Sequence, residues 1–146
     1  MRASKDPINV DLEYDLDEDI GKVPLIAEDF SRVIVNLCNN AFDAMRDKVT
    51  SMEGQEYKPK LQIRTFKKDQ ANFIEITDNG PGISDEIKDK ILQPFYTTKK
   101  GKEGTGLGLS ITNDIIKAHG GKLSINTTIE KGSTFSIILP GETHNV

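Results

Sequence analysis

Apolar and polar residues alternate in several short segments of the chain, and this alternation predicts half-buried β-strands. In the first segment, Ile8, Val10, Leu12 and Tyr14 fall on one face. The strands predicted after it span 61–65, 73–77, 123–127 and 134–139. The chain is therefore expected to contribute two further strand pairs, each joined by a turn, with Gly132 in the second turn.

Two longer segments show the spacing of an amphipathic helix instead, at about 28–48 and at about 106–118. The apolar positions predicted to face the core are Phe30, Val33, Ile34, Leu37, Ala41, Ala44 and Met45 in the first, and Leu107, Ile111, Ile115 and Ala118 in the second. Gly120 follows the second helix as a C-terminal glycine. Ser84 is the expected N-cap of a short helix that runs to about Leu92.

The elements follow in the order strand, helix, two strands, short helix, loop, helix and two strands. Strands that follow one another directly tend to pair, which favours a mixed, mostly antiparallel sheet with helices packed on one face. The expected fold class is therefore α+β, a two-layer α/β sandwich formed by a single domain over residues 1–146. A doubly wound parallel sheet fits this order less well, because it needs a helix between successive strands.

Composition and charge narrow the functions that this domain can have. The net charge of −4 opposes broad affinity for nucleic acid. Apolar runs such as 33–35 are too short to span a bilayer, and no signal peptide opens the sequence. Cys38 is the sole cysteine, which fits a reducing compartment. We expect a cytoplasmic domain without direct membrane contact, and anchoring of a longer protein in the inner membrane stays open.

Three polar residues fall on one face of the first predicted helix. Asn36 and Asn40 are four residues apart and Asp43 is three further on, so their side chains stack. Asparagine and aspartate are poor helix-interior residues because they compete for backbone hydrogen bonds. One interpretation is a solvated face. The other is a metal site, because an amide oxygen is a hard ligand that suits Mg²⁺.

A turn-forming segment, Asp78-Asn79-Gly80-Pro81-Gly82-Ile83, directly follows the strand predicted at 73–77. Its glycines permit positive φ angles and close approach of a ligand to the backbone. A carboxylate at the end of a strand can accept a hydrogen bond from an exocyclic amine such as that of adenine. Taken alone, the segment is more typical of a surface loop.

A glycine-rich segment leads into the second long helix, namely Gly104-Thr105-Gly106-Leu107-Gly108-Leu109-Ser110. Free N–H groups at a helix N-terminus bind phosphate well when glycines clear the approach. The spacing matches neither the P-loop nor the dinucleotide fingerprint. Either phosphate binding or close packing through small residues would explain it. Lys99, Lys100 and Lys102 form a basic cluster just before it.

Together these segments resemble the superfamily of gyrase, chaperone, histidine kinase and mismatch-repair ATPases, and in particular the sensor histidine kinases. The boxes that carry the resemblance are the N-box at 36–41, the G1 box at 78–82, the F-box at 93–99 and the G2 box at 104–110. Ala118-His119-Gly120-Gly121 and Gly132-Ser133-Thr134-Phe135 also resemble the kinase branch. The resemblance extends over about 8–140, the expected folded core.

The resemblance implies the Bergerat fold, with ATP and Mg²⁺ as ligands. It implies that Asn40 coordinates Mg²⁺ and that Asn36 supports the metal and the phosphates. Asp78 would bind the adenine amine, with Thr134 helping through a water. The other residues implied at the site are Asp43, Gly80, Gly82, Ile83, Phe95, Lys99, Lys100, Gly104, Thr105, Gly106, Leu107, Gly108 and Leu109.

Two of these implications need separate comment. Some kinases of the family carry a basic residue where this chain has Asp43, so a contact between Asp43 and nucleotide stays open. The segment 96–103 has no apolar periodicity and is expected to form a mobile lid, with Phe95 at its start. Within it, Lys99 or Lys100 would meet a phosphate and assist phosphoryl transfer.

The residue at position 36 bears on the type of reaction. The hydrolysing relatives carry a glutamate there as general base, whereas the Asn36 amide is not basic. The sequence thus favours phosphoryl transfer to a histidine on a separate dimerisation domain, with a response regulator as a further partner. His119 and His144 lie outside any phosphoacceptor box, and His119 is expected to be structural. A stand-alone ATPase or serine kinase, and a non-catalytic nucleotide-binding module, remain as alternatives.

Overall fold

The computed structural model describes residues 9–16, 27–52, 56–93 and 108–140. Its elements are β1 (Asp11–Asp15), α1 (Ala27–Ser51), β2 (Lys60–Lys68), β3 (Ala71–Asp78), α2 (Asp85–Lys88), α3 (Gly108–Ala118), β4 (Lys122–Thr128) and β5 (Gly132–Pro140). This is the order of elements that the sequence predicts. Both long helices begin or end within about three residues of the predicted positions.

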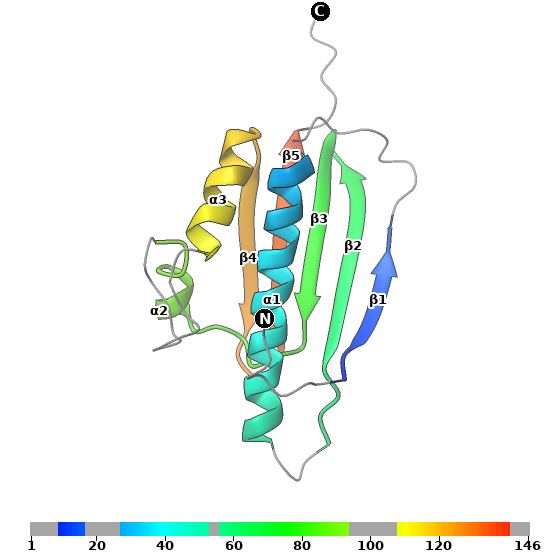
Figure 1. The fold of residues 1–146 in the computed structure, drawn as a ribbon, viewed down its shortest axis with the longest axis vertical. Helices are drawn as coiled ribbons and strands as arrows, with labels where there is room; N and C mark the ends of the chain where they lie inside the picture. The colour runs from blue at the N-terminus through cyan, green and yellow to red at the C-terminus, as the bar shows by residue number, and fades with distance from the viewer. Residues whose placement is uncertain (1–8, 17–26, 53–55, 94–107, 141–146) are drawn as a thin grey trace, which may run out of the picture.

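The strands form one sheet in the order β1-β2-β3-β5-β4, in which β1 and β2 are parallel and the other neighbours are antiparallel. Figure 1 shows α1 and α3 packed in front of one face of this sheet. The structure therefore confirms a two-layer α+β sandwich with a mixed, mostly antiparallel sheet. In the described parts of the chain, no helix is long and apolar enough to cross a membrane.

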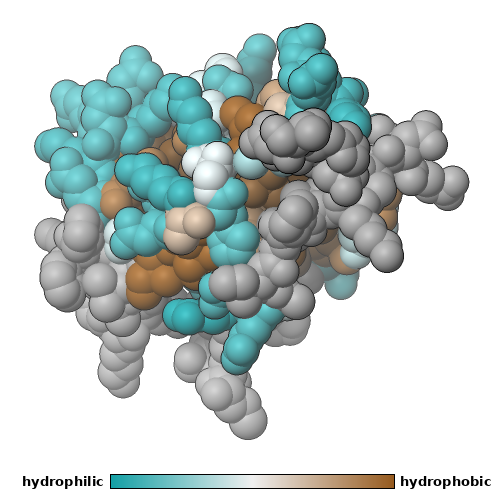
Figure 2. Space-filling model, turned by 90° about the horizontal axis from the view of Figure 1, so that it is seen from above, coloured by the Kyte–Doolittle hydropathy of each residue, from teal (hydrophilic) through white to brown (hydrophobic). Residues whose placement is uncertain are grey.

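The core lies between α1 and the helix-facing side of the sheet. From α1 the buried apolar side chains are Phe30, Val33, Leu37, Ala41 and Met45, and from the strands they are Leu61, Ile76, Leu123, Ile125, Phe135, Ile137 and Leu139. Burial of this apolar surface is the main force that holds the layers together. In the view from above, brown hydrophobic residues lie between teal hydrophilic ones (Figure 2).

The prediction of a half-buried first strand is wrong for two of its apolar residues, because Leu12 is 46% and Tyr14 is 61% exposed. They pair with Leu61 and Ile63, so they do point to the helix-facing side of the sheet. However, β1 is an edge strand, and α1 packs over the centre of the sheet near β3 (Figure 1). Among the described elements, no helix covers this edge.

The buried face of α3 also differs from the prediction. Thr112 and Ile116 are fully buried, whereas Ala118, which was predicted to face the core, is exposed. The helix is rotated so that its buried stripe includes a threonine, a residue that hydrophobic periodicity does not select. The short helix α2 ends at Lys88, earlier than predicted, and turns continue beyond it.

The predicted caps are confirmed. Ser84 is the N-cap of α2, and its side chain accepts a hydrogen bond from the N–H of Ile87. Gly120 ends α3 with φ 76°, and its N–H donates to Lys117 while the N–H of the next glycine donates to Ile116. This pair of bonds is a Schellman motif. His119 packs edge-on against Phe30 with ring centroids 4.8 Å apart, which supports the structural role expected for it.

Candidate functional site

A cavity of about 310 Å³ opens between the C-terminal half of α1, the loop after β3, α2 and the start of α3. Its lining is mostly apolar, with a few polar side chains, as is usual for small-molecule sites. The residues that line it are Asn40, Ala41, Ala44, Asp47, Asp78, Pro81, Gly82, Ile83, Ser84, Ile87, Ile91, Leu109, Ser133 and Phe135. Five of the predicted site residues, from three motifs far apart in the sequence, meet here.

Asp78 is the buried charged group of this cavity, with 5% of its surface exposed. Its Oδ1 accepts a hydrogen bond from the N–H of Gly80 at 2.8 Å. Burial raises the pKa of Asp78 to about 6, while bonds from the N–H groups of Gly80 and Ser133 and the charge of Lys48 act in the opposite direction. A perturbed carboxylate in an apolar cavity is typical of a functional site.

The backbone around Asp78 is packed so closely that glycine is required at two positions. Gly132 has φ 134°, and a Cβ there would overlap the carbonyl oxygen of Asp78. Gly82 has φ 78°, and a Cβ there would overlap the carbonyl of Thr128. The loop after β3 and the β4–β5 turn are thus pressed together without side chains between them.

Hydrogen bonds join the same two segments. The N–H of Glu130 donates to the carbonyl of Pro81 at 2.7 Å, and the N–H of Ile83 donates to Thr127 Oγ1 at 2.7 Å. Thr127 Oγ1 also lies 2.9 Å from Ser133 Oγ. The loop that follows Asp78 is therefore held by the turn opposite to it.

The structure does not bring Thr134 to the cavity beside Asp78. The register pairs Asp78 with Ser133, whereas Thr134 pairs with Thr77 on the other face of the sheet, and their Oγ1 atoms are 3.0 Å apart. Thr134 lines instead an open hollow of about 420 Å³ at the end of the sheet, which Asp78 and Lys131 also border. Ser133 is the hydroxyl residue that lines the cavity itself.

The predicted polar face of α1 separates into three environments. Asn40 lines the cavity. Asn36 Nδ2 donates to Thr112 Oγ1 at 3.3 Å and so joins α1 to α3. Asp43 forms an ion pair with Arg46 at 2.9 Å and is not among the residues that line the cavity.

One lining residue of the cavity offers an oxygen of the kind that binds Mg²⁺. Asn40 presents a hard amide ligand, and the described residues contain no cluster of three His, Cys, Asp or Glu side chains. Such a site suits Mg²⁺, which keeps several waters and binds phosphate oxygens. Gly108 is the first residue of α3. Phe95, Lys99, Lys100, Gly104, Thr105, Gly106, Leu107 and the segment 96–103 lie outside the described residues.

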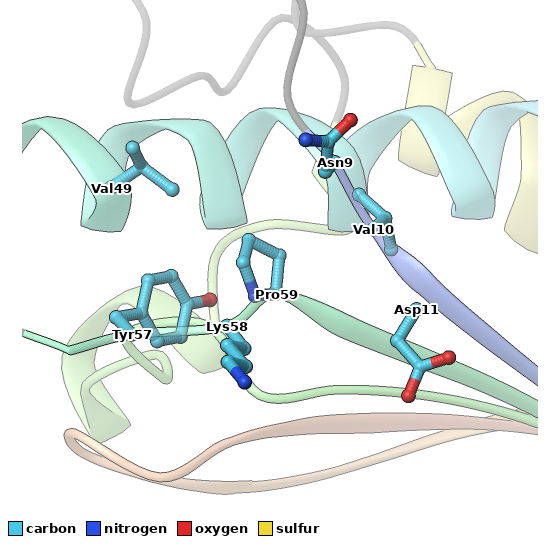
Figure 3. A pocket seen from close by; sticks show the side chains of 7 residues that line it. All are labelled: Asn9, Val10, Asp11, Val49, Tyr57, Lys58 and Pro59. Atoms are coloured by element: carbon cyan, nitrogen blue, oxygen red, sulfur yellow. The ribbon is translucent and has the colours of Figure 1, made fainter.

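A larger cavity, of about 580 Å³, lies under the C-terminal end of α1 (Figure 3). Val49 borders it from α1, Tyr57 and Pro59 from the segment before β2, and Val10 from the segment before β1. None of the residues from the sequence boxes lines it. Size alone therefore does not identify the functional site, and the smaller cavity is the better candidate.

The hydrogen bonds that hold the wall of the cavity involve four residues that the sequence did not indicate as site residues, namely Lys48, Asn79, Thr127 and Ser133. Asn79 belongs to the G1 box, yet its side chain bonds the backbone at the start of β2 instead of lining the cavity. Its Oδ1 accepts from the N–H of Lys60 at 2.8 Å, and its Nδ2 donates to the carbonyl of Lys58 at 2.8 Å. Strand alternation could have selected Ser133, because it places neighbouring residues on opposite faces.

Comparison with known proteins agrees with this geometry. A family model described as "Histidine kinase-, DNA gyrase B-, and HSP90-like ATPase" matches residues 26–143. The chain is 35% identical over 138 residues to the sensor kinase CckA of Brucella abortus, which covers 90% of this chain and 14% of that protein. It is 39% identical over 131 residues to the adaptive-response sensory kinase SasA of Gloeothece citriformis, which covers 88% of this chain and 31% of that protein.

Solved structures show the same likeness. The nucleotide-free catalytic domain of histidine kinase ThkA is 30% identical and has a TM-score of 0.72, over 90% of this chain and 78% of that chain. The chain therefore has the fold of a histidine kinase catalytic domain and is similar to a minor part of each of the two sensor kinases.

Proposed function

Because the chain belongs to the family of histidine kinase-, DNA gyrase B- and HSP90-like ATPases, we propose that it binds ATP with Mg²⁺ and supplies the γ-phosphoryl group to a histidine. This histidine lies on a separate dimerisation domain, and a response regulator is the further partner in two-component signalling. The observation that carries the proposal is the buried Asp78 carboxylate in an apolar cavity that also contains Asn40.

Adenine fits the Asp78 end of the cavity. The carboxylate can accept a hydrogen bond from the exocyclic amine, and the apolar side chains of Ile83, Ile91 and Leu109 can pack on the ring. Ser133, in place of Thr134, is the hydroxyl that would assist from β5. Guanine presents a carbonyl where adenine has the amine, so the carboxylate would reject it.

The phosphates and Mg²⁺ belong at the opposite end, where α1 and the start of α3 meet. Asn40 would hold the ion, which supplies charge neutralisation between phosphate oxygens when it is bound. The first N–H groups of α3 would face phosphate oxygens, since a helix N-terminus favours anions. Lys99 and Lys100 would add charge-assisted hydrogen bonds from the segment before it.

Asn36 favours transfer over hydrolysis. Its amide is not basic, so it cannot activate a water molecule, and its Nδ2 donates to Thr112. The domain would position the γ-phosphoryl group and leave the nucleophile to the partner domain. We expect the isolated chain to bind ATP and to hydrolyse it very slowly, and brisk steady-state phosphate release would contradict the proposal.

Calorimetry with ATP and GTP tests the adenine assignment. ATP should bind more tightly, and Asp78→Asn should weaken ATP binding by about 1–3 kcal/mol, because a buried polar partner is lost. Exposed Asp114 on α3 offers the matched control, since Asp114→Asn should leave ATP binding unchanged. Equal affinities of the wild type for ATP and GTP would refute the assignment.

The metal and the transfer step need their own measurements. Asn40→Ala should remove most of the Mg²⁺ dependence of ATP binding, while the preference for ATP over GTP remains. Mixing the chain with a histidine-bearing helical hairpin domain, Mg²⁺ and labelled ATP should give a labelled histidine. Absence of label with every hairpin tested, together with normal ATP binding, would favour a nucleotide-binding module without catalysis.

A further inference from the structure

The ammonium group of Lys48 lies among three backbone carbonyl oxygens from two distant segments. Its Nζ donates to the carbonyls of Asn79 and Gly80, each at 3.3 Å, and to that of Glu130 at 2.9 Å. The three N–H donors of a lysine are thus matched by three acceptors. One side chain of α1 therefore joins the loop after Asp78 to the β4–β5 turn.

The surroundings of this ammonium are themselves fixed. Lys48 Nζ lies 4.7 Å from the centre of the Tyr57 ring, within cation–π range. Figure 3 shows Tyr57 below the C-terminal turns of α1. The Tyr57 hydroxyl donates to Asn79 Oδ1 at 3.2 Å. The ring is thus linked to Asn79, whose backbone carbonyl accepts from Lys48. The lysine is held on one side by an aromatic face and on the other by carbonyls.

We propose that Lys48 is a positioning residue for adenine recognition, which holds the loop and the turn together and so orients the Asp78 carboxylate toward the base. The inference rests on the function proposed above and deepens it. Lys48 is not among the residues that line the cavity, so it would act through Asp78 instead of touching the nucleotide.

Two physical effects connect Lys48 to Asp78. Without the ammonium, the carbonyls of Asn79, Gly80 and Glu130 would lose their shared donor. The loop and the turn would then depend on the bonds from Glu130 to Pro81 and from Ile83 to Thr127, and would be held less firmly. A shift of the loop would also move Gly80. Because the N–H of Gly80 donates to Asp78 Oδ1, the orientation of the carboxylate would change. In addition, the positive charge of Lys48 favours the ionised form of Asp78 and partly opposes the effect of burial on its pKa.

Other charged or titratable groups also face Asp78. Burial raises the pKa of Tyr57 to about 12, and the charge of nearby Asp78 contributes to this increase. Asp47 lines the same cavity, and Lys88 and Lys131 line the neighbouring hollow that Asp78 borders. Of these cations, Lys48 is the one whose charge acts on the pKa of Asp78. Its removal should therefore be visible in a pH profile.

The first measurement compares ligands with and without a base. Lys48→Met should weaken ATP binding about tenfold, because it removes charge-assisted bonds that hold the adenine end. Inorganic tripolyphosphate, which has no base, should bind the variant and the wild type equally. Lys117→Met removes an exposed lysine from the last turn of α3 and should change neither affinity. Equal loss for ATP and tripolyphosphate would overturn the proposal, since it would indicate general damage.

The second measurement is ATP affinity as a function of pH. The terminal phosphate titrates in the same range as Asp78, so Asp78→Asn serves as the reference that contains the phosphate effect alone. After the phosphate effect is subtracted, the midpoint of the remaining pH dependence of ATP affinity is assigned to Asp78. This midpoint should move to higher pH in Lys48→Gln, which keeps a donor but no charge. It should return toward the wild-type value in Lys48→Arg. An unchanged midpoint in Lys48→Gln would refute the proposal even if Lys48→Met does not fold.

The outcomes separate this inference from the proposed function. If the wild type binds ATP poorly, or Asp78→Asn keeps the full wild-type pH profile, the assignment of Asp78 to adenine fails. If Asp78→Asn behaves as expected but the Lys48 variants match Lys117→Met, the role of Lys48 alone is refuted.

Discussion

The two ends of the cavity are constructed differently. At the Asp78 end, the backbone itself forms the wall, since Gly132 lies against the Asp78 carbonyl and the N–H of Glu130 donates to Pro81. At the α3 end, the described contacts come from side chains, such as the 3.3 Å bond from Asn36 to Thr112.

Because of this difference, substitutions at the two ends of the cavity should affect stability to different extents. A wall made of backbone cannot change without moving strands, so substitutions at the Asp78 end should affect the free energy of unfolding together with base recognition. Side chains on two helices can change while the helices stay packed, so substitutions at the α3 end should cost less stability than substitutions in the backbone wall. The predictions below test this difference, from the largest expected effect to the smallest.

Gly132→Ala should have the largest effect on stability. The position has φ 134°, and the new methyl group would overlap the Asp78 carbonyl, which belongs to the backbone of a central strand and cannot move alone. We expect a loss of about 3 kcal/mol or more in the free energy of unfolding, from strain and overlap together. Urea denaturation followed by circular dichroism measures it.

Gly120→Ala is the matched control for this substitution. Gly120 also has positive φ, at 76°, but the nearest atom to a new Cβ is a Pro140 side-chain carbon at 3.7 Å. The cost should be about 1 kcal/mol, from the left-handed backbone alone. Equal losses for Gly120→Ala and Gly132→Ala would show that the contact with Asp78 does not constrain the wall.

The second prediction concerns the pH dependence of stability at the Asp78 end. Burial raises the pKa of Asp78 from 3.8 to about 6, so between these values the folded protein binds more protons than the unfolded one. The stabilisation from protonated Asp78 is complete below the unfolded value and is lost as pH rises through about 6. A pKa difference of about 2 corresponds to about 3 kcal/mol.

Asp78→Asn removes this titration and leaves the other carboxylates in place. The free energy of unfolding of the variant, relative to wild type, should therefore increase by up to about 3 kcal/mol between about pH 4 and pH 7.5. At about pH 7.5, the substitution that weakens ATP binding would therefore stabilise the folded protein. A constant difference across this pH range would mean that the carboxylate is not destabilised by burial.

The sequence predicted the element order, the core face of α1 and the convergence of Asp78, Gly82 and Leu109 with considerable success. Each of these depends on local signals, either a helical period or a short motif. The convergence of the motifs follows from the fold class, because the strand that ends at Asp78 and the helix that contains Asn40 lie in facing layers.

Features that depend on tertiary arrangement were not accessible. The three carbonyls around Lys48 come from segments up to 82 residues away, and no periodicity in the sequence predicts contacts between such distant segments. The choice between Ser133 and Thr134 depends on register, since a shift by one residue exchanges the two faces of a strand. The exposure of Leu12 and Tyr14 depends on how far the helix layer reaches.

The third prediction concerns the bond between α1 and α3. Asn36→Ala leaves the fully buried Thr112 hydroxyl without this donor and should cost about 1–2 kcal/mol of stability. Thr112→Val keeps the side-chain shape, and in that background Asn36→Ala should cost less. A double-mutant cycle measures the coupling. Additive effects would show that the 3.3 Å contact does not contribute to stability.

The smallest expected effect distinguishes two neighbouring hydroxyl residues at the Asp78 end. Ser133 lines the cavity and its Oγ lies 2.9 Å from Thr127 Oγ1, whereas Thr134 contacts Thr77 on the opposite face. Ser133→Ala should therefore weaken ATP binding about fivefold, which corresponds to about 1 kcal/mol for one hydroxyl. Thr134→Val keeps the shape of its side chain and should leave ATP affinity unchanged, although it removes the bond to Thr77. Tripolyphosphate affinity should stay constant in both variants, because the two hydroxyls lie at the base end. A larger loss in Thr134→Val than in Ser133→Ala would mean that the register between β3 and β5 is shifted by one residue in solution, and the backbone wall around Asp78 would have to be assigned anew.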